Sequence, residues 1–145
     1  MTNVRIERSF RVSPERLFAA VTKQADLLKW WGPEGVHVPE HSLDLSGLGP
    51  WYSVMVNDAG ERFKVSGHVT SYDPPCSVGF TWAWHDDADA RGHESHVTFT
   101  IVETDDGAQL IVDHHELLDE ESALNHRGGW QSTLNRLAAV LEENS

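Results

Sequence analysis

Histidine is the residue of this sequence best suited to chemistry, because an imidazole can bind a metal or move a proton near neutral pH. His114 follows Leu110 and Val112 at intervals of two, so on a strand it shares their apolar face. His126 precedes Trp130 by four residues, which places both on one side of a helix. A buried imidazole there could orient a ligand or act as a general base. It could equally be a core histidine bonded to the backbone or to water.

The spacing of the other candidates argues against a metal site. His93 and His96 are three residues apart in an expected strand, and His114 and His115 are adjacent. The two rings of each pair therefore point to opposite faces, whereas zinc needs ligands that converge. The acidic segment 86–89 lacks the glycine and the distal glutamate of a calcium loop. We expect no metal and no cofactor.

Recognisable motifs for nucleophilic catalysis are absent from the sequence. It has no G-x-S-x-G turn, no phosphate-binding loop and no dinucleotide fingerprint. Its single cysteine, Cys76, is expected to be a structural thiol. The catalytic residues, if there are any, stay unknown. An enzyme of the cyclase or hydrolase kind would use His114 with Tyr72 or another polar wall residue.

Aromatic side chains provide the main candidate for a binding site. Trp51 and Met55 share one face of an expected strand, as do Phe80 and Trp82 of another. Bulky rings at this spacing can fill a core, or they can hold a sheet away from a helix and leave a cavity of roughly 300–1,000 Å³. The candidate lining residues are Trp51, Met55, Phe80, Trp82, Phe99, Val112, His114, His126, Trp130 and Leu134.

A C-terminal helix over residues 123–141 must position these side chains. Trp130, Leu134, Leu137 and Leu141 form one apolar stripe on it. The adjacent glycines at 128–129 predict a kink or close backbone packing. The other expected elements are strands at 4–12, 36–45, 51–56, 63–72, 78–84, 97–101 and 110–116, and short helices that start at residue 13 and at residue 23. A sheet that curls around the last helix gives an α+β fold.

Length and charge limit the possible functions. A chain of 145 residues is expected to form one domain over residues 1–145, with a core that needs no disulfide. Its formal net charge of −12 disfavours binding to nucleic acid or to an anionic membrane. No signal peptide and no membrane-spanning run is apparent at the sequence level, so we expect a cytoplasmic protein that is a monomer or a homodimer.

Several short motifs, in this order, resemble one family. They are Trp30-Trp31-Gly32-Pro33, Asp44-Leu45 before Trp51, Tyr72-Asp73-Pro74-Pro75 before Phe80-Thr81-Trp82, the segment from Gly107 to Leu110, and Gly129-Trp130 before Leu134 and Leu137. The chain is similar to proteins related to the activator of the heat-shock chaperone ATPase, within the START-like (SRPBCC) superfamily. The resemblance implies a helix-grip fold: a curved antiparallel sheet wrapped around a long C-terminal helix, with two short helices after the first strand.

The resemblance also implies candidate partners. Single-domain bacterial members resemble binders of small molecules, so a small apolar or amphipathic ligand in the internal cavity is the expected partner. The founding co-chaperones suggest a chaperone and a stress response as the alternative. Distant relatives include polyketide cyclases and lipid carriers, which keeps an enzyme with a cavity histidine as a third possibility.

Overall fold

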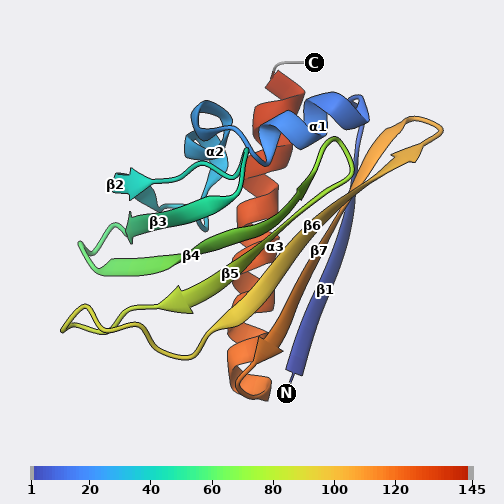
Figure 1. Ribbon diagram of the computed structural model, residues 1–145. Helices are drawn as coiled ribbons and strands as arrows, with labels where there is room; N and C mark the ends of the chain where they lie inside the picture. Colours follow the sequence, from blue (N-terminus) through green and yellow to red (C-terminus); the bar gives the residue numbers. More distant parts are fainter. Residues whose placement is uncertain (1, 144–145) are drawn as a thin grey trace.

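Seven antiparallel strands form one curved sheet, and a long C-terminal helix lies across its inner face (Figure 1). The computed structural model describes residues 2–143. Across the sheet the strands follow the order β1-β7-β6-β5-β4-β3-β2. The elements are β1 (Thr2–Phe10), α1 (Pro14–Ala20), α2 (Gln24–Trp30), β2 (His37–Ser42), β3 (Gly49–Val56), β4 (Arg62–Asp73), β5 (Ser77–Trp84), β6 (Ser95–Thr104), β7 (Gly107–Leu117) and α3 (Glu120–Glu143).

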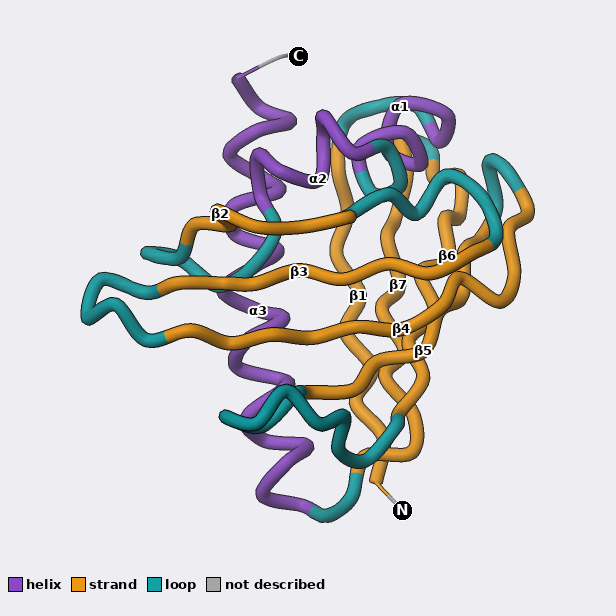
Figure 2. Tube along the Cα trace, turned by 60° about the vertical axis from the view of Figure 1, so that its left-hand side comes forward, coloured by secondary structure: helices purple, strands orange, loops and turns teal. Residues whose placement is uncertain are grey.

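The two short helices gather at one end of α3 (Figure 2). Ser13 begins α1 as expected, because its hydroxyl oxygen accepts a hydrogen bond from the backbone N–H of Arg16 at 3.1 Å and Pro14 follows at the first helical position. Helix α2 ends at Trp30, and the chain then turns through residues 31–36 toward β2. This turn becomes one wall of the site described below.

The sheet curves where its pairing is irregular. The register of β4 against β5 shifts between Val69 and Ser71, which is typical of a bulge that bends a strand. Gly67 of β4 lies so close to β5 that a Cβ atom there would collide with the backbone carbonyl oxygen of Thr81. A glycine at this position therefore lets the two strands approach as the sheet curls around α3.

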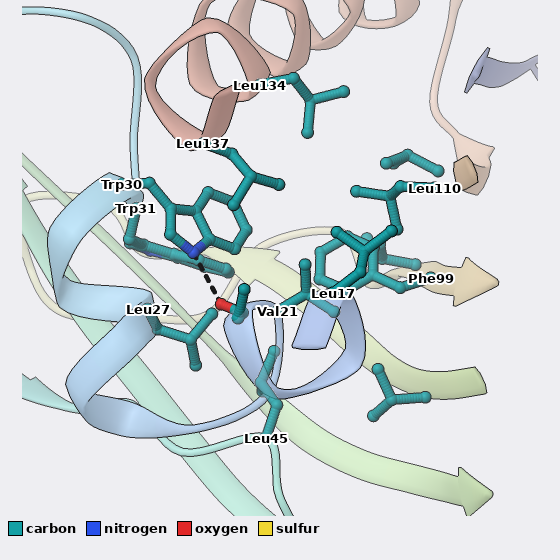
Figure 3. Packing of buried hydrophobic residues seen from close by; sticks show 14 of the residues in the cluster. Leu17, Val21, Leu27, Trp30, Trp31, Leu45, Phe99, Leu110, Leu134 and Leu137 are labelled. Carbon is teal, nitrogen blue, oxygen red and sulfur yellow. Dashed lines mark hydrogen bonds between the residues drawn. The ribbon is translucent and has the colours of Figure 1, made fainter. Parts of the chain in front are cut away.

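The packed core lies between the C-terminal half of α3, the short helices and the sheet (Figure 3). Leu137 of α3 lies beside Trp30 of α2, and the side chains of Leu134, Leu137, Trp30 and Leu27 are almost completely buried. The indole N–H of Trp30 donates to the backbone carbonyl of Ala20 at 2.8 Å, so its only polar group is satisfied. The apolar stripe predicted for the last helix is confirmed.

The α+β helix-grip fold is also confirmed, while the bounds of individual elements differ. Helix α3 starts at Glu120 and continues through Gly128 and Gly129. A Cβ atom on either glycine would meet nothing within 4 Å, so the prediction of close backbone packing there is wrong. The expected strand at 36–45 is shorter, because β2 ends at Ser42. No helix within residues 2–143 is long and apolar enough to span a membrane.

Candidate functional site

A pocket of about 670 Å³ lies beside the N-terminal half of α3. We call it the α3 pocket. The walls that face α3 are formed by strands β3, β4 and β5 and by the turn between α2 and β2. Its lining is made up of Trp31, Gly32, Pro33, Val36, Met55, Asn57, Phe63, Trp82, Trp84, Asp119, Glu121, Ser122, Asn125, His126, Gly129, Trp130 and Thr133. This lining combines apolar rings with a few polar groups, as is typical of small-molecule sites.

Helix α3 contributes one stripe to the pocket, which runs for about three turns. The stripe begins at Glu121 and Ser122 and ends at Thr133. At 1.5 Å per residue it is about 18 Å long, so the site suits an elongated ligand. Gly129 lies within the stripe, and the space beside it is open because nothing lies within 4 Å of where its Cβ would be.

Trp82 is the centre of the aromatic wall. Its ring centroid lies 5.4–5.9 Å from those of Trp31, Trp51, Trp84 and Trp130. Tilted and edge-on contacts at this separation are favourable for aromatic pairs. Of these five tryptophans, Trp51 does not line the pocket and packs behind the others. The wall is therefore braced from within and does not collapse into the space beside α3.

His114 is fully buried behind this wall. Its Nδ1 accepts a hydrogen bond from the indole N–H of Trp130 at 3.1 Å, which requires Nε2 to carry the proton. Nε2 in turn lies 2.7 Å from the hydroxyl of Ser95, which itself donates to the carbonyl of Trp82. Burial, with a smaller contribution from His126, lowers the pKa of His114 to about 3. The imidazole is thus neutral at pH 7 and both its nitrogens are occupied.

His126 lies in the pocket wall and has the opposite tautomer. Its Nε2 accepts from the indole N–H of Trp84 at 3.0 Å, and its Nδ1 lies 2.7 Å from the backbone carbonyl of Ser122, to which it must donate. Burial lowers the pKa of His126 as well. The rings of His126 and His114 meet edge to face with centroids 4.7 Å apart. Each histidine therefore holds one tryptophan of the wall in place.

This bonding argues against the role of general base considered for His114. Its acceptor nitrogen is already used by Trp130, and its ring does not line the pocket. Tyr72, the suggested catalytic partner, packs its ring 5.6 Å from that of Phe18 and is also outside the pocket lining. The geometry is that of a core histidine that braces an aromatic wall.

Arg136 fixes the turn that forms the other wall. Its Nη1 lies 3.0 Å from the backbone carbonyl oxygens of Trp31 and Gly32 and 3.1 Å from that of Val36. Burial lowers the pKa of Arg136, although nearby Glu34 opposes that shift. Within the turn, Gly32 has a φ of +90°, a backbone conformation that glycine adopts readily and other residues rarely adopt. Arg136 therefore holds this turn against α3.

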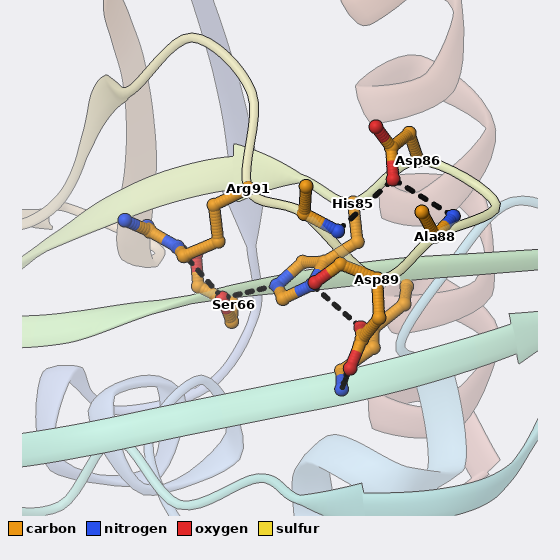
Figure 4. A network of polar contacts seen from close by, with 8 residues as sticks. Ser66, His85, Asp86, Ala88, Asp89 and Arg91 are labelled. Carbon is orange, nitrogen blue, oxygen red and sulfur yellow. Dashed lines mark hydrogen bonds and ion pairs between the residues drawn. The ribbon is translucent and has the colours of Figure 1, made fainter.

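A second polar cluster lies outside the α3 pocket, on β4 and the loop after β5 (Figure 4). His85 is 2.7 Å from the Ser66 hydroxyl through Nε2 and 2.8 Å from the Asp89 carboxylate through Nδ1. Arg91 also donates from Nε to the Ser66 hydroxyl oxygen at 2.9 Å and from Nη2 to the Ser66 carbonyl at 3.1 Å. The order Ser–His–Asp resembles that of a hydrolase triad, but none of these side chains lines the pocket. The cluster anchors the loop to the sheet.

Comparison with known proteins identifies the family. The model of the family described as "Activator of Hsp90 ATPase homolog 1-like protein" matches residues 11–142. The chain belongs to this family. We refer to it below as AHSA1-like. No curated protein matches the chain.

Solved structures of similar proteins share the fold. The crystal structure of the AHSA1 protein from Silicibacter pomeroyi is 57% identical, covers 99% of this chain and 100% of its own, and superposes with a TM-score of 0.97. A protein from Chromobacterium violaceum is 25% identical with a TM-score of 0.81, and the match covers 97% of each chain. A protein from Rhodobacter sphaeroides, 20% identical, has a TM-score of 0.82 over 99% of this chain and 95% of its own, and shows the fold alone.

In this AHSA1-like chain the ten residues proposed from the sequence occupy two places. Met55, Trp82, His126 and Trp130 line the α3 pocket. The other six are buried outside its lining, in or against the packed core, and are Trp51, Phe80, Phe99, Val112, His114 and Leu134. Strand parity identified buried side chains, but it does not distinguish a ring that borders the pocket from one in the layer behind it.

Three residues that shape the α3 pocket are not among the ten proposed from the sequence, namely Arg136, Gly129 and Trp31. Arg136 could not be found from its own segment, because its contacts are with a turn 100–105 residues earlier in the chain. Gly129 was expected to mark a kink or close backbone packing, whereas the structure shows open space beside it. Trp31 could have been found, since it belongs to the Trp30-Trp31-Gly32-Pro33 motif. Across residues 2–143 no group of three or more acidic, histidine or cysteine side chains is placed to hold a metal ion.

Proposed function

We propose that this AHSA1-like protein binds a small apolar or amphipathic molecule in the α3 pocket. The observation that carries the proposal is the open space of about 670 Å³ beside Gly129, bordered by Trp31, Trp82, Trp84 and Trp130. Burying an apolar ligand against these rings contributes about 25 cal/mol for each Å² removed from water. The polar groups along α3 then orient the ligand.

The pocket walls support binding because they are organised in advance. Trp84 and Trp130 each donate to a histidine, and Trp31 donates from its indole nitrogen to the Ser53 hydroxyl at 2.9 Å. Held rings lose little conformational freedom when a ligand arrives, so more of the contact energy appears as affinity.

Gly129 allows a direct test. In Gly129→Leu a branched side chain enters the pocket, so we expect at least a roughly tenfold loss of affinity for a neutral apolar dye such as Nile red. The measurement is dye fluorescence titrated against protein. Gly128→Leu is the matched control, because Gly128 is the preceding residue of the same helix, is equally uncrowded and does not line the pocket.

Thermal unfolding must accompany the titration, to show that both leucine variants fold. Both replace glycine by a good helix former, so neither should lower Tm. Equal dye binding by the wild-type protein, Gly129→Leu and Gly128→Leu would contradict the proposal.

A chaperone partner is the second candidate, and it rests on the family description, which names an activator of the Hsp90 ATPase. Stimulation of the ATPase rate of purified Hsp90 by this protein would support it. The Gly129→Leu variant separates the two functions, because a surface that docks a chaperone should not depend on the space beside α3. Unchanged ATPase rates over a wide range of protein concentration would contradict this second candidate.

A further inference from the structure

The charged groups of the α3 pocket all have one sign. Asp119 and Glu121 line it, and the lining contains neither lysine nor arginine. Both carboxylates belong to the N-terminal end of α3, whereas Trp31 and Thr133 lie toward the other end of the pocket. From these observations we propose that the pocket selects a ligand with an apolar body and a cationic head, such as an alkylammonium or arylammonium ion. The inference rests on the proposed function and specifies its ligand class.

The two carboxylates are available to such a head. Glu121 is exposed and makes no ion pair or side-chain hydrogen bond within residues 2–143. One oxygen of Asp119, Oδ1, accepts from the backbone N–H of Ser122 at 2.8 Å and caps α3. An ammonium group can therefore approach both carboxylates without displacing a cation that belongs to the protein.

No positive group of the lining opposes a cationic head. His126 is the only histidine there, and its two nitrogens already bond to Trp84 and Ser122. Arg136 lies near the far end of the pocket and points its guanidinium at backbone carbonyls of the 31–36 turn. The helix itself contributes only about half a positive charge at its N-terminus, against two carboxylates.

The aromatic wall also suits a cation. Four indoles and the exposed ring of Phe63 border the pocket, and a quaternary ammonium is attracted to the face of an aromatic ring, most strongly to that of tryptophan. The same rings take up the apolar body. An anionic amphiphile would gain only the apolar part and would be repelled at the carboxylate end.

Three amphiphiles with the same chain and different heads test the inference. Nile red bound to the wild-type protein is displaced by each of three compounds: decyltrimethylammonium, 1-decanol and decanoate. All are used at low ionic strength and below any critical micelle concentration. We expect the cation to bind roughly tenfold more tightly than the carboxylate, with the alcohol between them. Raising the salt concentration to about 0.5 M should reduce this difference, because it screens exposed charges.

Charge-removing variants locate the effect. Asp119→Asn with Glu121→Gln should reduce the preference for the cation over the carboxylate to less than about threefold, with a larger loss of affinity for the cation than for 1-decanol. Asparagine preserves the helix cap, so the double variant should fold. Glu120→Gln is the matched control, since Glu120 lies in the same first turn but does not line the pocket, and it should retain the wild-type preference.

The outcomes separate this inference from the function on which it rests. Equal affinity for the three amphiphiles, or tightest binding of decanoate, would overturn the cation preference while the pocket remained a binding site. Displacement that is the same in wild type and Gly129→Leu would overturn binding in the pocket itself. A preference that survives in the double variant would show that Asp119 and Glu121 do not cause it.

Discussion

The two halves of α3 carry different side chains and have different roles. Its C-terminal half presents Leu134, Leu137 and Leu141 to the packed core, where leucines and rings interlock. Its N-terminal half borders the α3 pocket with Ser122 and Gly129 as well as with the rings of His126 and Trp130. Gly129 thus leaves open space beside the helix, whereas Leu134, Leu137 and Leu141 fill the core beside theirs.

Two tryptophans illustrate the difference. Trp30 is completely buried and bonds to a backbone carbonyl of α1. Trp84 is half-buried, borders the pocket and bonds to a histidine that is itself part of the wall. The first ring supports the fold, and the second shapes a space. Three experiments test this contrast, beginning with the one whose expected effect is largest.

Truncating the two rings should have unequal costs. Trp30→Ala should lower the free energy of unfolding by about 3–5 kcal/mol, because it leaves a large cavity and removes the partner of the Ala20 carbonyl. Trp84→Ala should cost about 1–2 kcal/mol, since part of that ring already borders the pocket. Urea unfolding followed by circular dichroism gives both values. Equal losses would mean that the pocket side of the molecule is packed as tightly as the core.

Acidic pH should lower the free energy of unfolding through His114, which is buried behind the aromatic wall of the α3 pocket. The pKa of His114 is lowered from 6.5 to about 3 in the folded protein, mainly by burial. Below pH 6.5 His114 is therefore protonated in the unfolded chain but stays neutral in the folded one. The free energy of unfolding falls as the pH drops below about 6.5. Between pH 6.5 and 4.5 this one group should remove about 2 kcal/mol of stability.

The non-titrating variant His114→Gln isolates that contribution. Its unfolding free energy should fall about 2 kcal/mol less than that of the wild-type protein over the same pH range. His37→Gln, at an exposed position of an edge strand, is the control for the substitution itself. Identical pH profiles for His114→Gln and wild type would show that His114 does not resist protonation.

The smallest of the three effects concerns the wall that Arg136 holds. Arg136→Ala should lower the unfolding free energy by about 1–2 kcal/mol, because the carbonyl oxygens of Trp31, Gly32 and Val36 lose their donor. Backbone amides of the 31–36 turn should exchange with deuterium faster than in wild type. Arg127→Ala, at an exposed position of the same helix, should stay within about 0.5 kcal/mol of wild type. A turn with unchanged exchange in Arg136→Ala would show that other contacts fix it.

Periodicity alone gave much of the fold and of the buried face. Alternation by two residues predicted the strands, the spacing of Trp130, Leu134 and Leu137 predicted the gripping helix, and Ser13-Pro14 predicted the start of α1. These patterns work because burial on one face of an element repeats with the geometry of that element. The ends of β2 were harder to predict, because the sequence pattern is weakest at the ends of an element. The path of the helix through Gly128 and Gly129 was also hard to predict, because glycine carries no side chain that contributes to the pattern.

The sequence by itself determined the class of fold, the acidic surface and which side chains avoid water, since all of these follow from composition and local spacing. Only the tertiary structure decided that His114 and His126 each accept a bond from a tryptophan, that Arg136 binds a distant turn, and that the space opens beside Gly129. Such features depend on which residues meet across elements far apart in the chain. A pocket is a gap left by that packing, and no short stretch of sequence contains it.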